Sequence, residues 1–211
     1  PGHQQITEDE EIARVVPVIQ KIKEKYDIPV SIDTYKSRVA EAALEAGADM
    51  LNDIGGFLYD EKMAELAVRY DVPVCLMHNR NNTEYQDFVP DVVADLKKCL
   101  AVAEKYGVKK ENIMLDPGVG FGKTYEQNLA IINHLEVLCD MGYPVLLATS
   151  RKSVIGLTLD LPVTEREEGT IATSVIGAMK GCDFVRVHDV QANARALRMT
   201  EAIMYGKEKE E

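Results

Sequence analysis

Polar or charged residues follow each stretch of the chain that we expect to form a β-strand. The endings are Ser31-Ile-Asp33, Leu51-Asn52-Asp53, Leu76-Met77-His78, Leu115-Asp116-Pro117, Thr149-Ser-Arg-Lys152 and Val185-Arg-Val-His188. In a parallel α/β barrel the carboxyl ends of all strands open on one face, so these side chains would converge. Carboxylates, an amide, cations and a histidine on one rim indicate a ligand site, because a core does not need them.

The oxygen-bearing half of this set consists of Asp33, Asn52 and Asp116. A carboxylate can accept two parallel hydrogen bonds from an N–C(NH₂)–N edge, and an asparagine amide can both donate and accept. These three residues therefore predict a site for an amino-substituted heterocycle. Asp53 points to the opposite side of its strand, and its carboxylate is expected to cap the following turn.

The cationic half consists of Lys152, Arg186 and His188. On a strand, Arg186 and His188 would share one face, with Val187 on the other. An arginine fork beside a histidine suits a phosphate or diphosphate. Lys152, directly after an apolar strand, is a candidate ligand for the heterocycle or the anion. The alternatives are a solvated Arg-Lys pair and a structural histidine; His78 is open to both interpretations.

The glycine-rich segment Leu115-Asp-Pro-Gly-Val-Gly-Phe-Gly-Lys-Thr124 resembles a phosphate-binding loop. The Walker pattern requires glycine five residues before the last Gly-Lys, and this chain has Pro117 there, so the match fails. The glycines would still let the backbone and Phe121 approach a ligand closely. The alternative is an ordinary connection between a strand and a capped helix.

Helix and strand patterns alternate along the whole chain, which indicates the α/β class. Strands are expected at 29–33, 49–53, 72–77, 112–116, 144–148 and 183–187, and helices at 7–22, 36–45, 60–70, 90–107, 124–140, 164–181 and 189–206. Thr7, Thr124 and Thr164 each open a capping box, and Asp189 is expected to cap the last helix. The strands are continuous apolar runs, so the sheet should be parallel and buried on both faces. We predict one domain, 1–206, followed by a charged tail, 207–211.

The composition limits the classes of function. A net charge of −11 and an isoelectric point near 4.9 argue against non-specific nucleic-acid binding. No apolar run approaches the length of a membrane span. The four cysteines are too scattered for a metal site or a disulfide framework, which favours reduced thiols in a cytoplasmic protein.

Taken together, these motifs resemble the dihydropteroate synthases. The motifs that carry the resemblance occur in that family's order and spacing: Ser31-Ile-Asp-Thr34, Asn52-Asp-Ile54, Leu76-Met-His78, the glycine-rich segment, Thr149-Ser-Arg-Lys-Ser153 and Arg186-Val-His-Asp189. The resemblance implies a (β/α)₈ barrel, usually a homodimer. It also implies the condensation of 6-hydroxymethyl-7,8-dihydropterin diphosphate with p-aminobenzoate, with Mg²⁺, to give dihydropteroate and pyrophosphate.

The resemblance also implies roles for individual residues. The pterin would be held by Asp33, Asn52, Asp116 and Lys152, with Ile54 and Met77 on its faces. The diphosphate would be bound by Arg186, Val187 and His188. The aminobenzoate pocket would include Pro1, Phe121, Lys152 and Ser153. Asp33, Lys152, Arg186 and His188 would take part in catalysis.

Six expected strands are fewer than the eight of a barrel, and the pattern opens on a helix. Compared with the family pattern, this sequence lacks the first two β/α units. It therefore also lacks the asparagine that binds the metal in that family and most of two mobile loops. From this resemblance we expect the 211-residue chain alone to be inactive or nearly so. Appreciable synthesis by the purified chain would contradict that expectation.

Three other functions fit part of the pattern. A pterin-binding methyltransferase domain with a corrinoid partner would not need the cations at Arg151-Lys152 and Arg186/His188, since its substrate carries no diphosphate. A catalytically inactive barrel that only binds pterin or a partner would agree with the absence of the first two β/α units. A phosphosugar barrel could use Lys152 as a Schiff-base amine, which requires a lowered pKa and leaves Asp33 and Asn52 unexplained.

Overall fold

The computed structural model describes residues 5–206, and within them the chain forms two compact units. Unit 1 contains the residues up to Asn79 together with Ala94–Leu115. Unit 2 contains Arg80–Val93 and the residues from Asp116 onward. The prediction of a single domain over 1–206 stays a prediction.

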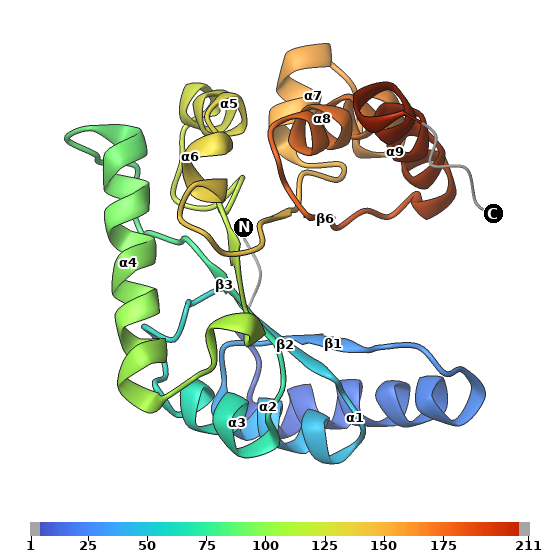
Figure 1. The fold of residues 1–211 in the computed structure, drawn as a ribbon. Helices are drawn as coiled ribbons and strands as arrows, with labels where there is room; N and C mark the ends of the chain where they lie inside the picture. The colour runs from blue at the N-terminus through green and yellow to red at the C-terminus, as the bar shows by residue number, and fades with distance from the viewer. Residues whose placement is uncertain (1–4, 207–211) are drawn as a thin grey trace. The chain divides into compact units, whose positions relative to one another are not determined.

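Unit 1 is built on a parallel sheet whose strands follow one another in sequence order (Figure 1). Its strands are β1 (Ser31–Asp33), β2 (Met50–Asp53), β3 (Val74–Met77) and β4 (Ile113–Asp116), of which the last residue, Asp116, is assigned to unit 2. Its helices are α1 (Glu8–Lys25), α2 (Ser37–Glu45), α3 (Lys62–Tyr70) and most of α4 (Phe88–Tyr106), with a 3₁₀ turn, η1, at Lys110–Asn112. In register, Asp33 pairs with Asn52, and Asn52 pairs with Cys75.

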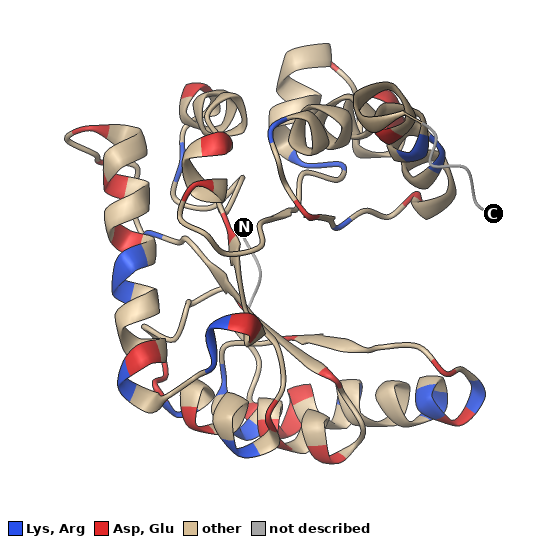
Figure 2. Ribbon diagram, viewed as in Figure 1, with Lys and Arg blue, Asp and Glu red and all other residues tan. Residues whose placement is uncertain are grey.

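The burial of these strands agrees with the apolar runs in the sequence. All four residues of β3 are buried, as are Leu51, Asn52 and Asp53 of β2. Figure 2 shows the charged residues of unit 1 mainly on the helices and connections, while its strands are largely uncharged. The predicted parallel α/β arrangement is therefore confirmed for this unit.

Unit 2 consists mainly of helices that flank a short parallel strand pair, in which Leu146 pairs with Phe184 and Leu147 with Val185. Its elements are α5 (Tyr125–Asn133), α6 (Glu136–Cys139), β5 (Leu146–Leu147), α7 (Ser153–Leu159), η2 (Val163–Glu165), α8 (Glu167–Met179), β6 (Phe184–Val185) and α9 (Val190–Tyr205). Helix α8 packs against both α7 and α9.

Helix starts were predicted with mixed success. Thr124 closes the expected capping box with Gln127, and the Thr7 side chain accepts the Glu10 N–H. The box expected at Thr164 is wrong, because this residue lies in η2 and α8 begins at Glu167 without a side-chain cap. Helix α7 was not predicted at all. None of the helices in residues 5–206 has the length and apolar character needed to cross a membrane.

Candidate functional site

Four of the predicted pterin residues belong to unit 1, at the carboxyl ends of β1, β2 and β3. The register places Asp33 beside Asn52, and the Asn52 carbonyl accepts a hydrogen bond from Thr34 N at 3.2 Å. Asp33 is exposed, whereas Asn52 is buried. Met77 ends β3, and Ile54 follows β2. The structure therefore gathers these residues at one edge of the unit 1 sheet.

A buried turn after β2 carries Ile54, and Asp53 holds it. The Asp53 carboxylate accepts hydrogen bonds from Gly55 N at 2.7 Å and Phe57 N at 2.8 Å, which confirms the predicted turn cap. Burial is the main reason that the pKa of Asp53 is raised to about 6; the nearby Asp60 and Asp33 carboxylates add to it. The two backbone N–H groups oppose the shift without cancelling it.

Two further contacts fix the same turn. Asn79 Nδ2 donates to the Ile54 carbonyl at 3.2 Å, which ties the segment after β3 to the segment after β2. Gly56 has φ +57°, and a Cβ at this position would lie 2.6 Å from Cys99 Sγ. The position therefore excludes side chains both by backbone conformation and by space.

His78, which the sequence left ambiguous, is a buried structural residue of unit 1. Its side chain has no exposed surface, and its Nε2 lies 3.3 Å from Asp95 Oδ2 on α4. The other oxygen of Asp95 accepts a hydrogen bond from Lys98 at 2.7 Å. This chain of contacts anchors the end of β3, next to Met77.

The remaining described candidates belong to unit 2, where Asp116 is the buried carboxylate. Asp116 Oδ1 accepts the Gly118 N–H at 2.7 Å. Burial raises the pKa of Asp116, whereas Lys152, the Gly118 N–H, Lys123 and Arg186 act in the opposite direction. Because burial disfavours the ionised carboxylate, a ligand with N–H donors would stabilise it.

The Lys152 ammonium lies over the glycine-rich loop of unit 2. Lys152 Nζ donates to the Val119 carbonyl at 2.5 Å and lies 5.0 Å from the centre of the Phe121 ring. Lys152, Phe121 and Asp116 are thus grouped, as the sequence predicted. Ser153 is exposed at the start of α7, and Pro1 lies outside the described residues.

The anion-binding candidates line one cavity of about 370 Å³ in unit 2. Its walls are formed by Ala148, Ser150, Lys152, Arg186, Val187 and His188. The expectation that Arg186 and His188 lie on a strand is wrong, because β6 ends at Val185. The Arg186 N–H still donates to the Leu147 carbonyl at 3.0 Å, and Val187 lines the cavity together with its two neighbours.

Ser150 orients the His188 ring. Ser150 Oγ accepts the His188 backbone N–H at 3.1 Å and lies 2.8 Å from His188 Nδ1. If the serine hydroxyl donates to Nδ1, the imidazole Nε2 carries its proton outward as a hydrogen-bond donor. A donor of this kind beside Arg186 and Lys152 suits a phosphate oxygen.

Arg151, the cation next to Lys152 in the sequence, has a structural role. Its guanidinium forms a forked ion pair with the Asp189 carboxylate, at 2.9 and 3.0 Å. Asp189 stands at the N-cap of α9 as expected, but its side chain makes no cap hydrogen bond. The predicted cap was wrong because the nearby guanidinium engages the carboxylate instead.

Two residues that hold the glycine-rich loop, Lys123 within it and Asn128 on α5, were missed. Lys123 is buried, and its ammonium donates to the Gly118 and Phe121 carbonyls at 3.0 Å each. Asn128 Oδ1 accepts the Gly120 N–H at 2.6 Å. Both hold the loop from inside. The Walker-like Gly-Lys pair was the only sequence signal for Lys123, and Asn128 had none.

Comparisons with known proteins agree with this arrangement. The family model described as "Pterin binding enzyme" matches residues 1–188. The dihydropteroate synthase of Clostridium beijerinckii is 62% identical over 97% of this chain and 76% of its own length. That of Bacillus subtilis is 52% identical over 97% of this chain and 72% of its own length.

Solved structures give the same result for the fold. A dihydropteroate synthase from Clostridium difficile, solved with pteroic acid, matches with a TM-score of 0.95 at 52% identity, over 98% of this chain and 79% of its own. The enzyme of Xanthomonas albilineans, solved with 4-aminobenzoic acid, has a TM-score of 0.93 at 37% identity, over 97% of this chain and 76% of its own. These matches confirm the predicted barrel class.

The family is therefore established by sequence and structure together, and the synthases are favoured over the pterin-dependent methyltransferases. The chain belongs to the dihydropteroate synthases of the pterin-binding enzyme family.

Proposed function

We propose that this chain provides the residues with which its enzyme joins 6-hydroxymethyl-7,8-dihydropterin diphosphate to p-aminobenzoate. The observation that carries the proposal is the cavity of unit 2, where Lys152, Arg186 and His188 are gathered. Three nitrogen-bearing side chains in a protein of net charge −11 favour an anionic ligand group.

The pterin ring is recognised by the oxygen-bearing residues. Asp33 and Asp116 accept from its N–C(NH₂)–N edge, and Asn52 both donates and accepts. Met77 and Ile54 cover its faces. The raised pKa of buried Asp116 supports this role, because ligand N–H groups would stabilise its ionised form.

The reaction breaks the bond between the pterin methylene carbon and the diphosphate oxygen. Arg186, His188 and Lys152 stabilise the negative charge that develops on the departing pyrophosphate. Asp33 stabilises the positive charge on the pterin-methylene group. The aniline nitrogen of p-aminobenzoate, held near Phe121, Ser153 and Pro1, attacks that carbon and releases a proton to solvent. No protein nucleophile is required.

Mg²⁺ belongs to the expected reaction as a counter-charge for the diphosphate. In residues 5–206, no three histidine, cysteine, aspartate or glutamate side chains are grouped so that they could hold a metal ion. We therefore assign no residue of this chain to Mg²⁺ and no step to the ion.

A pair of variants tests the two halves of the site. Titration calorimetry would compare binding of the pterin diphosphate with binding of 6-hydroxymethylpterin, which lacks the diphosphate. Arg186→Gln should weaken only the diphosphate ligand, by about 10- to 100-fold, the range expected for a lost charged hydrogen bond. Asp33→Asn should weaken both ligands by similar factors.

Loss of both ligands in Arg186→Gln would overturn the assignment of the cavity to the diphosphate. Turnover is measured separately, as dihydropteroate formed with p-aminobenzoate present or omitted. The Clostridium beijerinckii relative serves as the active reference. A chain that binds neither ligand while the reference works would refute the proposed function.

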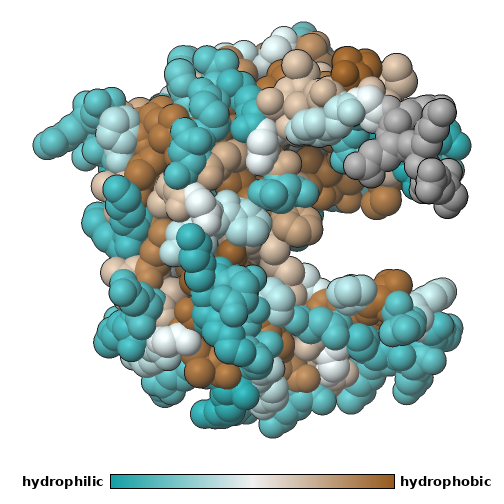
Figure 3. Space-filling view, viewed as in Figure 1, coloured by the Kyte–Doolittle hydropathy of each residue, from teal (hydrophilic) through white to brown (hydrophobic). Residues whose placement is uncertain are grey.

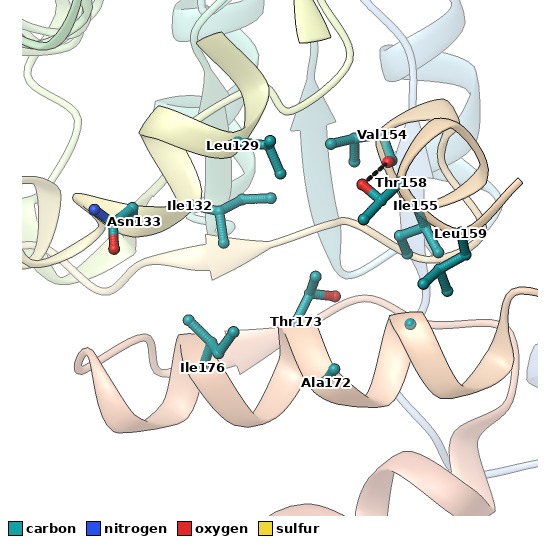
Figure 4. Close-up of a pocket in the computed structure, with 11 residues that line it drawn as sticks. Leu129, Ile132, Asn133, Val154, Ile155, Thr158, Leu159, Ala172, Thr173 and Ile176 are labelled. Carbon is teal, nitrogen blue, oxygen red and sulfur yellow. Dashed lines mark hydrogen bonds between the residues drawn. The ribbon is translucent and has the colours of Figure 1, made fainter. Parts of the chain in front are cut away.

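We also propose that the chain pairs with a second copy through the α5–α7–α8 face of unit 2. An apolar groove of about 300 Å³ there is lined by Leu129, Ile132, Val154, Ile155, Leu159 and Ile176, among others (Figure 4). Leu157 and Met179, on α7 and α8, are 67% and 62% exposed. In the view of Figure 3, unit 2 shows apolar residues among hydrophilic ones.

Exposed apolar surface of this kind marks an interface when it is contiguous. Sedimentation equilibrium should give a dimer for the native chain and a monomer for Leu157→Glu, with Leu58→Glu in unit 1 as a control that stays dimeric. A native monomer at micromolar concentration would refute the pairing. A cytoplasmic location stays a prediction, in keeping with the four free thiols.

A further inference from the structure

The segment that presents Lys152 has an unusual backbone. Arg151 has φ +58°, a left-handed conformation that a residue with a side chain adopts rarely. Lys152 N donates to the Thr149 carbonyl at 3.1 Å, so the chain makes a tight turn between β5 and α7. A disfavoured conformation persists only where its surroundings hold it.

Arg166 supplies most of that hold. Its Nη1 donates to the Arg151 carbonyl at 2.9 Å and to the Lys152 carbonyl at 3.3 Å, and its Nε donates to the Leu161 carbonyl at 3.0 Å. A single planar guanidinium thus bridges the turn before α7 to the segment after it. Lysine could not reproduce this fork.

Neighbouring residues complete the hold. Thr170 Oγ1 accepts the Arg151 N–H at 3.1 Å and donates to the Arg166 carbonyl at 2.8 Å. The Arg151 guanidinium is itself held by Asp189. The backbone of residues 151–152 is therefore fixed from α8 on both its N–H and its carbonyl groups.

Gly156 makes room for this arrangement. A Cβ built at Gly156 would overlap the Nη2, Cζ and Nε atoms of Arg166. The guanidinium therefore lies directly on the backbone of α7, and only glycine permits it. Gly156 lies inside a helix, where glycine is intrinsically unfavourable, so the close approach accounts for its presence.

We propose that Arg166 is a positioning residue that sets the place of the Lys152 ammonium. The inference rests on the proposed function, in which Lys152 contacts the pterin diphosphate. The direction in which the Lys152 side chain leaves the backbone is fixed by the turn at 151–152. That turn places Nζ on the Val119 carbonyl, above Phe121 and in the cavity with Arg186.

The test compares four variants by calorimetry with the pterin diphosphate. Arg166→Ala removes the fork, Gly156→Ala displaces it by overlap, Lys152→Ala removes the ligand group, and Arg195→Ala removes an exposed arginine of α9 as a control. Arg166→Ala and Gly156→Ala should each weaken binding on the order of 10-fold or more, because small misplacements of a ligand group have large effects. Arg195→Ala should bind like the native chain.

Two results separate positioning from general damage. Guanidinium ion at tens of millimolar should restore binding to Arg166→Ala, against sodium chloride at equal ionic strength, but not to Gly156→Ala, where the site is filled. The double variant should be no weaker than either single one, because both remove the same contact. Thermal melts establish that each protein is folded at the assay temperature.

The failures are distinguishable. If Lys152→Ala binds like the native chain, the proposed role of Lys152 fails. If Lys152→Ala weakens binding while Arg166→Ala and Gly156→Ala do not, only the positioning inference is overturned. Should Arg166→Ala not fold, Gly156→Ala decides the matter, since alanine favours a helix and any weakening then comes from the displaced guanidinium.

Discussion

Asp53 gives the protein a stability that depends on pH in an unusual direction. Asp53 is only 1% exposed, and the pKa of its carboxyl group is raised from 3.8 to about 6. The perturbation to apply is a change of pH between 4 and 8, with Asp53→Asn as the reference that cannot ionise. Asparagine has the same shape and keeps one acceptor oxygen for the turn.

The sign follows from where the proton binds. Between pH 3.8 and about 6 the folded state holds a proton on Asp53 and the unfolded state does not. Stability from this group is therefore fully present below pH 3.8 and is lost as the pH rises through about 6. A shift of about two pKa units corresponds to about 3 kcal/mol of unfolding free energy.

Urea unfolding of the native chain and of Asp53→Asn at each pH measures this quantity. The difference between the two free energies of unfolding should change by about 2 kcal/mol between pH 4 and pH 7, with the native chain gaining at low pH, because part of the full effect already develops below pH 4. Groups with lowered pKa, such as Asp49, change both proteins alike and cancel. A difference that stays constant across this range, or that changes with the opposite sign, would refute the argument.

A neighbouring carboxylate offers an independent check of the cause. Asp60 raises the pKa of Asp53 through repulsion between like charges. The Asp60→Asn substitution should therefore lower the pKa of Asp53, and the stabilising effect of protonated Asp53 should be lost at a lower pH. No change would mean that burial alone sets the pKa.

Two further predictions concern unit 1 and the thiols. Gly56→Ala should lower the free energy of unfolding by about 3 kcal/mol, because its Cβ would overlap Cys99 Sγ and its φ is positive. Gly107→Ala, which also has a positive φ but open space around it, should lower the free energy of unfolding by only about 1 kcal/mol. Urea titration of both variants would test this, and equal losses would contradict it. Burial raises the pKa of both Cys99 and Cys182 to about 12. Neither thiol should therefore react with an aromatic disulfide reagent at pH 8 until urea unfolds the chain. Rapid labelling of either thiol in the folded protein, measured by mass spectrometry, would count against this prediction.

Contacts between near neighbours were predictable from the sequence. Asp53 caps a turn whose N–H groups lie two and four residues ahead. Thr124 caps α5 through Gln127, three residues on. In both cases the partner lies within one turn of chain, so the spacing of residue types carries the whole signal.

Contacts between remote residues were not predictable, even where the residue types were noticed. His78 was recognised as ambiguous, but its partner Asp95 lies on α4, 17 residues away. Asp189 was expected to cap α9, yet a guanidinium 38 residues earlier engages its carboxylate. Nothing in a single sequence says which of several charged residues the fold will bring to such a position.

Helix α7 and Arg166 illustrate why the missed part of unit 2 could not be found. The α7 segment has seven residues, with glycine, threonine and β-branched side chains, so its intrinsic preference for a helix is weak. Its first turn is held instead by a guanidinium bonded to backbone carbonyls 14 and 15 residues away, over a glycine that leaves the necessary space. A backbone carbonyl has no residue type, so its partner leaves no pattern in the sequence. Residues that position a site through the backbone are therefore the ones that only a structure can reveal, whereas those expected to contact the ligand directly were marked by charge and strand position.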